Sequence, residues 1–124
     1  MYYKGLYQRP RPSQLCPALL PPIVIPGHAS FPSGHSTQAH LMALCIGDVL
    51  AGFPQHDTML DDATTLADRI ARNREIAGMH YASDTQAGID LAAGIIPLLR
   101  GLPNNSWYQS ALQAAQAEWN PAKQ

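Results

Sequence analysis

The stretch PSGHSTQAHLMALCIGDVL, residues 32–50, marks the change from an irregular segment to a helix. Seven of the eleven prolines lie within residues 10–32, and proline disrupts both helices and central strands. From residue 34 onward, apolar residues recur at the spacing of one helix face. The members of this face are Leu41, Leu44, Cys45, Val49 and Leu50. The sequence therefore predicts an all-α fold in which a proline-rich loop, residues 1–33, leads into a helix over residues 34–52.

The rest of the chain continues the helical pattern without internal repeats. Three more helices are predicted, over residues 57–77, from residue 83 or 84 to residue 99, and over residues 106–119. Asp57 is a favourable cap at the start of the first of these, and Gly78 is suited to end it. With 124 residues, the chain has the size of one small domain. We expect a single domain over residues 1–124, with its helical region over residues 34–119.

The composition argues against a nucleic-acid-binding protein and against a transmembrane helix. The net charge is −1 at pH 7, so there is no basic field to attract a polyanion. Charged residues make up only 14% of the chain, against about 25% in typical soluble domains. No apolar run approaches the roughly 18 residues of a membrane span, and no signal peptide is visible. We therefore expect a soluble protein, in the cytoplasm or, if a further segment precedes it, in the periplasm.

Three short motifs hold the residues most suited to binding an anion. Their spacings are K-x6-R-P, P-S-G-H and R-x5-H-x3-D, and their chemistry-bearing members are Lys4, Arg11, Ser33, Gly34, His35, Arg74, His80 and Asp84. The chain has only eight Lys and Arg and five His, so this ordered set is hard to reach by chance. Cations, helix N–H groups and imidazoles together can hold a tetrahedral anion and do chemistry on it. Arg9, two residues before Arg11, is interpreted as solvent-exposed or as lying behind the site.

Two of the motifs also imply a local geometry. Ser33 and Gly34 fall at a predicted helix start, where the first N–H groups lack partners inside the helix and the helix dipole favours an anion. A simple helix cap would explain Ser33 but not His35. Asp84 follows His80 by four residues, about one helical turn, so it can contact one ring nitrogen and leave the other free as a nucleophile or ligand. An N-cap role for Asp84 is compatible with that contact.

Over residues 4–88 these motifs resemble those of the type 2 phosphatidic acid phosphatase superfamily, which also contains the bacterial class A acid phosphatases and the vanadium-dependent haloperoxidases. The resemblance implies a helical bundle and a phosphoester hydrolase that needs no metal or other cofactor. The implied phosphate ligands are Lys4, Arg11, Ser33, Gly34 and Arg74. In that scheme His80 forms a phosphohistidine, Asp84 orients it, and His35 protonates the leaving oxygen and then activates water. One position departs from the pattern, because Asn73 stands where the family often has serine, although asparagine keeps the capacity to hydrogen-bond.

The resemblance leaves two alternatives open. In a vanadate-dependent haloperoxidase, which uses peroxide and halide, His80 would bind vanadate and His28 would lie beside it. His28 is implicated because the corresponding haloperoxidase position holds His or Phe. In the second alternative, the chain is an incomplete domain that retains the motifs without enzymatic activity. Under the phosphatase hypothesis the partner is a small-molecule phosphoester or phosphate, and the sequence specifies no particular substrate.

The position of Lys4 leads to a further expectation. In the family the corresponding lysine is carried near the end of a preceding helix, whereas only three residues precede Lys4 here. We therefore expect a partial, N-terminally incomplete bundle that a second copy of the chain or a missing segment completes. We also expect Lys4 to be the weakest-held member of the site, displaced from Arg74 and His80, because ordering a lysine side chain costs up to about 2 kcal/mol.

Overall fold

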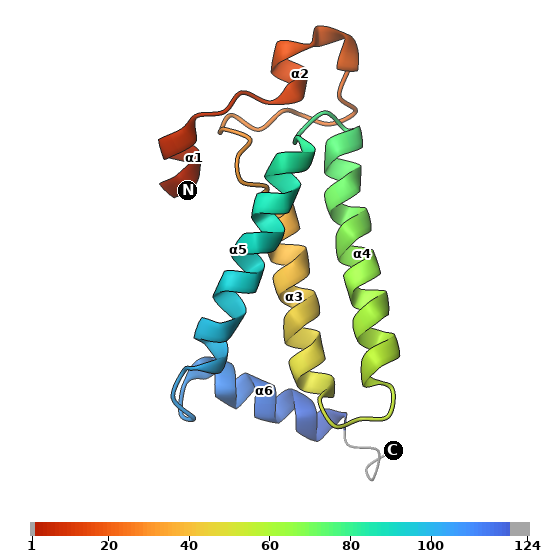
Figure 1. Ribbon diagram of the computed structural model, residues 1–124, viewed down its shortest axis with the longest axis vertical. Coiled ribbons are helices and arrows are strands. Elements are labelled where there is room, and N and C mark those ends of the chain that lie inside the picture. The colour runs from red at the N-terminus through yellow and green to blue at the C-terminus, as the bar shows by residue number, and fades with distance from the viewer. Residues whose placement is uncertain (1, 120–124) are drawn as a thin grey trace.

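The computed structural model describes residues 2–119 and confirms the all-α prediction within them. Its elements in chain order are α1 (Tyr2–Tyr7), α2 (Pro12–Leu15), the 3₁₀ turn η1 (Pro17–Leu19), α3 (Gly34–Leu50), α4 (His56–Ile76), α5 (Ala82–Arg100) and α6 (Trp107–Glu118). Residue 1 and residues 120–124, the ends of the expected domain, lie outside the described part. Figure 1 shows three long helices, α3, α4 and α5, with α1 and α2 at one end and α6 across the other. α3 packs along both α4 and α5, which contact each other far less, so α3 is the central helix.

The four long predicted helices are confirmed, with small shifts at their ends. α4 begins one residue earlier than expected, because His56 N–H already bonds to Phe53 O at 3.1 Å in the preceding turn. The prediction that Asp57 caps this helix is therefore wrong. Asp57 lies inside the first turn of α4, where its carboxylate is 2.8 Å from His56 Nδ1.

The prediction of an irregular segment over residues 1–33 is wrong in part, since α1, α2 and η1 lie within it. α1 ends before Pro10, so no proline interferes with it. Pro12 is the first residue of α2 and Pro17 is the first of η1. At a first helical position the missing N–H of proline costs nothing, so these prolines start short helices rather than prevent them.

A glycine sets the spacing between the two helices that carry the P-S-G-H and H-x3-D motifs. A Cβ atom on Gly88 of α5 would lie 2.7 Å from Ser36 Cβ and 2.8 Å from the backbone oxygen of Ser33. At the same crossing Ser33 N–H donates to Asp84 O at 3.0 Å, and Ser36 Oγ donates to Thr85 O at 2.8 Å. The close approach of α3 and α5 therefore depends on the absence of a side chain at Gly88.

Gly88→Ala is expected to lower the free energy of unfolding by about 1–3 kcal/mol, the usual cost of overpacking, because the methyl group must push α5 away from α3. Gly94→Ala in the same helix is the matched control, since among the described residues no heavy atom beyond its chain neighbours and the nearby backbone of α5 lies within 4 Å of its Cβ position. The control should gain up to about 1 kcal/mol from helix propensity. Denaturant titration followed by circular dichroism compares the two variants. Equal stability of both would contradict the close approach.

A polar cluster ties α6 to the other end of the bundle. Asp48 of α3 accepts hydrogen bonds from Arg100 Nη2 of α5 and from the Tyr108 hydroxyl of α6, each at 2.8 Å. Arg100 Nε also donates to both oxygens of the same carboxylate, at 3.1 Å. Three helices are thus joined at one carboxylate, far along α5 from the end that carries Asp84.

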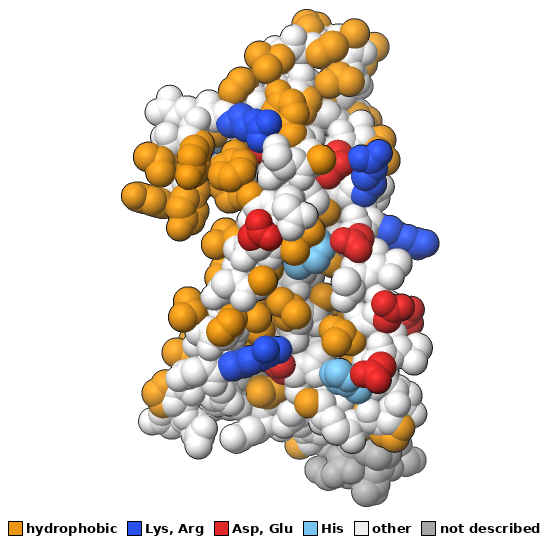
Figure 2. Space-filling view, viewed as in Figure 1, with side chains coloured by type: hydrophobic (Ala, Val, Ile, Leu, Met, Phe, Trp, Pro, Cys, Tyr) orange, Lys and Arg blue, Asp and Glu red, His pale blue; other side chains and the backbone are white. Residues whose placement is uncertain are grey.

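Apolar side chains gather on the surface over α1 and α2 (Figure 2). The large apolar residues exposed in this N-terminal part are Tyr2, Tyr3, Leu6, Tyr7, Leu15, Leu19, Leu20, Ile23 and Val24. No residue of α1 is buried, so this helix is held mainly through Lys4 and through the edge-to-face contact of the Tyr7 and Phe31 rings. Within residues 2–119, no helix combines the length and the apolar character needed to cross a membrane.

Candidate active site

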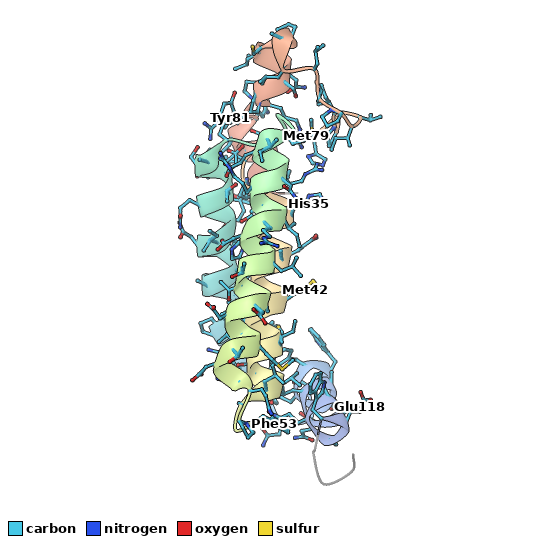
Figure 3. All side chains as sticks on the ribbon, turned by 90° about the vertical axis from the view of Figure 1, so that its right-hand side faces the viewer. His35, Met42, Phe53, Met79, Tyr81 and Glu118 are labelled. Atoms are coloured by element: carbon cyan, nitrogen blue, oxygen red, sulfur yellow. The ribbon has the colours of Figure 1, made fainter. Side chains whose placement is uncertain are left out.

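The three motifs meet at one end of the bundle, around a cleft of about 370 Å³. Its lining consists of Lys4, Arg11, Pro26, His28, Gly34, His35, Gln38, Arg74 and His80. Seven of the residues singled out in the sequence are therefore brought together, and the remaining two, Ser33 and Asp84, lie fully buried behind the cleft. Figure 3 shows His35 in the first turn of α3, at the same end of the bundle as Met79 and Tyr81.

Lys4 is firmly held, contrary to the expectation that it is the weakest-held member of the site. Its Nζ donates to three backbone carbonyls, those of Ala29 at 2.8 Å, Ser30 at 3.1 Å and Pro32 at 2.8 Å. These carbonyls belong to the loop that enters α3, and they hold the Lys4 ammonium group in place. Burial and the nearby Arg11 charge lower the pKa of Lys4, and the Asp84 charge opposes them.

Arg11 is almost completely buried, with 1% of its surface exposed. Its Nη1 donates to Met79 O at 2.8 Å, and its Nε donates to His28 O at 3.2 Å. Arg11 thereby joins the N-terminal segment to the loop before α3 and to the turn before α5. Burial and the charge of Arg74 lower its pKa. In contrast, the buried Nε of Arg74 has no hydrogen-bond partner within residues 2–119, so this donor stays available to an anion.

The start of α3 has the geometry of an anion-binding helix end. Ser33 is the N-cap, and its Oγ accepts a hydrogen bond from Ser36 N–H at 3.3 Å. Because a hydroxyl donates as well as accepts, capping leaves the Ser33 O–H free to donate. Gly34 and His35 occupy the first two helical positions, whose N–H groups have no acceptor inside the helix. The site thus combines two backbone donors with the positive end of the helix dipole.

His80 and Asp84 form a buried pair, as their spacing predicts. His80 Nδ1 lies 3.5 Å from Asp84 Oδ2, longer than an ordinary hydrogen bond, and Oδ2 also accepts Tyr81 N–H at 3.0 Å. α5 begins at Ala82, so Asp84 is its third residue and not its N-cap. Contacts of catalytic pairs are often long before substrate binds. A carboxylate facing Nδ1 favours a proton there and leaves Nε2 with a lone pair.

The pKa values of His80 and His35 are both lowered from the ordinary 6.5. Burial lowers the pKa of His80, and the charges of Arg11 and Lys4 lower it further, although Asp84 acts in the opposite direction. Burial and the charges of Arg74 and His80 lower the pKa of His35. A neutral imidazole is nucleophilic, whereas an imidazolium can act only as an acid or a hydrogen-bond donor. The lowered pKa of His80 therefore favours its neutral form.

His28 lies at the cleft rather than alone in solvent. Its Nδ1 lies 3.1 Å from Arg11 Nη2 and 3.2 Å from Ala29 O. As a residue His28 remains exposed, so it borders the cleft opening instead of being enclosed by it.

Arg9, for which the sequence left open a solvent-exposed position or one behind the site, contacts Asp84 behind the cleft. Its Nη1 donates to Asp84 Oδ1 at 2.7 Å and to Ser83 Oγ at 2.8 Å. Its guanidinium carbon lies 4.0 Å from the centroid of the Tyr81 ring. Nothing in the spacing from Lys4 or Arg11 separates a solvent-facing arginine from one that folds back onto α5, so a single sequence holds no signal for this contact.

Comparison with known proteins finds a matching family and two curated relatives. A family model described as the PAP2 superfamily matches residues 2–108. Two curated proteins from Mycobacterium tuberculosis, strains CDC 1551 / Oshkosh and ATCC 25618 / H37Rv, are each 33% identical to the chain over 92 residues. Both are named decaprenylphosphoryl-5-phosphoribose phosphatase, and the match covers 74% of this chain but 46% of each relative. The chain thus spans about half the length of the curated relatives it matches.

The family match extends over every part of the cleft. Residues 2–108 include the K-x6-R-P, P-S-G-H and R-x5-H-x3-D motifs, and with them every residue that was predicted at the site or that lines the cleft. From its sequence match and its bundle of helices around this cleft, the chain belongs to the PAP2 superfamily.

Proposed function

We propose that the protein hydrolyses phosphoesters through a phosphohistidine formed on His80. The observation that carries this proposal is the convergence of Lys4, Arg11 and Arg74 on one cleft with two histidines, one of which is backed by a buried carboxylate. Permanent cations and helix N–H groups match the oxygens of a phosphoryl group. The relatives in M. tuberculosis are named as phosphatases, which supports the same reaction class.

In the first step, Nε2 of His80 attacks phosphorus in line with the ester oxygen. The P–N bond forms as the P–O ester bond breaks, and protonated His35 gives its proton to the departing oxygen. Asp84 stabilises the positive charge that develops on the His80 ring. In the second step, neutral His35 takes a proton from a water molecule that attacks phosphorus. The P–N bond then breaks, and phosphate leaves with His80 restored.

We propose that hydrolysis needs no cofactor, because the protein itself neutralises the charge of the phosphoryl group. Lys4, Arg11 and Arg74 offer three positive charges to the non-bridging oxygens, and the start of α3 adds N–H groups at Gly34 and His35. We propose a small-molecule phosphomonoester as the substrate. The cleft opens to solvent beside His28, so the group attached to the phosphate can extend outward.

A paired assay on one sample tests the proposal. Phosphate release from 4-nitrophenyl phosphate and from an alkyl phosphate is measured without vanadate, and halide oxidation is measured with vanadate and peroxide. We expect phosphate release and competitive inhibition by both inorganic phosphate and vanadate. A folded sample that binds neither anion in calorimetry would refute the anion site itself. A sample that binds inorganic phosphate but releases none from either ester would support the non-enzymatic alternative.

The haloperoxidase alternative is kept because His28 borders the cleft and contacts Arg11. If it holds, His80 would bind vanadate, and His28→Ala should change halide oxidation. If the phosphatase proposal holds, the same variant should change phosphate release only slightly, because His28 has no part in the two steps above.

The proposed roles also predict an acidic pH dependence. His35 must be protonated to act as the acid, and burial and Arg74 lower its pKa below the ordinary 6.5. Activity is therefore lost as pH rises through this lowered pKa, so the falling limb of kcat/KM for an alkyl phosphate should lie below pH 6.5. His35→Asn should remove this limb from the residual activity. A wild-type profile that stays flat up to pH 8 would contradict the acid role of His35.

A further inference from the structure

Arg9 links the N-terminal segment to the carboxylate behind His80. Its ion pair with Asp84 is 2.7 Å long, and Asp84 is fully buried, whereas 35% of the Arg9 side chain is exposed. The guanidinium also stacks over the Tyr81 ring and donates to Ser83 Oγ. A short charge-assisted hydrogen bond from a stacked guanidinium has little freedom, so it fixes the position of the carboxylate.

The two oxygens of Asp84 have different partners. Oδ1 accepts from Arg9, whereas Oδ2 accepts from Tyr81 N–H and faces His80 Nδ1. A fully buried carboxylate without a cation would favour its protonated form. Arg9 supplies this cation on the side away from His80 and leaves Oδ2 directed at the ring.

The backbone of Arg9 is fixed as well. Its carbonyl accepts Ser30 N–H at 2.9 Å and Ser30 Oγ at 3.2 Å, and the Ser30 carbonyl in turn accepts Lys4 Nζ. Arg9 therefore connects the loop that holds Lys4 with the start of α5. It does not line the phosphate cleft, so it has no contact with the reacting atoms.

We infer that Arg9 is a positioning residue, which holds the Asp84 carboxylate ionised and directed at His80 and so keeps Nε2 of His80 free to attack phosphorus. This inference rests on the proposed function for its catalytic consequence. Its structural part concerns only the state of His80 and can be measured without turnover.

Removal of Arg9 has a pH signature. Other charged or titratable groups also face the His80–Asp84 pair or its cleft. They are Lys4 and Arg11 from the N-terminal segment, His28 from the loop before α3, His35 from α3, Arg74 from α4, and Tyr81 before α5. Burial raises the pKa of Asp84, but His80, Tyr81 N–H and Arg9 together bring it below its ordinary value. Loss of the Arg9 charge favours a proton on either member of the pair. On the acidic side of the pH profile, activity is lost when the state with neutral His80 and ionised Asp84 takes up a proton. This acid limb must then move to higher pH.

The experiment compares Arg9→Gln, Arg9→Lys and the matched control Arg100→Gln. Arg100 also bonds to a helix carboxylate, that of Asp48, but it ends α5 about 24 Å from Asp84 at the helical rise per residue. For Arg9→Gln we expect kcat to fall by roughly 10–100-fold, by analogy with residues that orient metal-binding histidines. KM and phosphate affinity should hardly change, the acid limb should move up, and ¹⁵N spectra should show His80 in a mixture of tautomers. Arg9→Lys should restore the acid limb, and Arg100→Gln should lose stability without moving it.

An acid limb that stays in place in Arg9→Gln, or a His80 tautomer unchanged from wild type, would overturn the inference. If Arg9→Gln does not fold, Arg9→Lys provides the test. Arg9→Lys keeps the charge, so a shift of its acid limb away from the wild-type position would also overturn the inference. If the wild type shows no turnover, the proposed function fails, but the ¹⁵N titration of His80 in wild type and Arg9→Gln still tests the role of Arg9.

Discussion

Phosphate release is expected to fall by on the order of 10⁴–10⁶-fold when His80 is replaced by alanine, because the covalent route loses its nucleophile. His80 lines the cleft beside Arg11 and Arg74, so the change removes a group at the reacting centre. Asp84→Asn should cost less, up to about 10⁴-fold, because the nucleophile remains but its tautomer is no longer fixed. Steady-state hydrolysis of 4-nitrophenyl phosphate measures both variants.

His56→Ala is the matched control for the loss of an imidazole. His56 begins α4, at the end of the bundle away from the cleft (Figure 1), and its ring is paired with Asp57. Its removal should leave activity at the wild-type level. Equal activity of His80→Ala and the wild type would contradict the covalent mechanism.

Trapping the intermediate separates covalent from direct hydrolysis. A phosphohistidine is a phosphoramidate, which survives base and is lost in acid. A base quench during turnover of a ³²P-labelled phosphoester should leave label on the wild type and on Asp84→Asn, but none on His80→Ala. Rapid turnover with no label on the wild type would exclude the His80 intermediate while leaving hydrolysis itself intact.

Most of the fold could be predicted from the sequence because its signals are local. The apolar face that includes Leu41 and Leu50, and the Ser33 cap, depend on residues within a few turns of one another. The structure places α3 at Gly34–Leu50, close to the predicted range. The motif residues also meet as expected, because Arg74 and His80 flank a short turn between α4 and α5.

Other features could not be predicted, because they depend on contacts between distant parts of the chain. Lys4 is held by carbonyls 25 to 28 residues away, and no spacing rule indicates which loop oxygens will turn toward a lysine. The Arg9–Asp84 pair joins residues 75 positions apart. The sequence left Ser83 and Asp84 as competing starts of α5, which begins at Ala82. Asp84 is therefore its third residue, where the carboxylate accepts the N–H of the N-cap residue Tyr81, and not the N-cap itself.

Arg11 and Arg74 both line the cleft but use their donors differently. The Arg11 donors are engaged by backbone carbonyls of Met79 and His28, in a buried position. Removal of Arg11 would leave these carbonyls unpaired, at a cost of about 1–3 kcal/mol for each buried group. Arg74 Nε has no partner within residues 2–119, so removal of Arg74 breaks no such bond.

Arg74→Gln is therefore expected to lower kcat by on the order of 10²–10³-fold, as loss of one oxyanion donor does, with little change in thermal stability. Arg11→Gln should lower both activity and stability, because Arg11 supports the loop before α3 as well as the cleft. Thermal unfolding with and without inorganic phosphate measures both effects, and the rise in Tm caused by phosphate should nearly vanish in Arg74→Gln. Arg72→Gln is the control, since Arg72 lies on the same helix with 69% of its side chain exposed and pairs with Glu75. If Arg74→Gln keeps the wild-type phosphate affinity and kcat, the free donor on Arg74 has no part in holding the anion, and the proposed clamp reduces to Lys4, Arg11 and the start of α3.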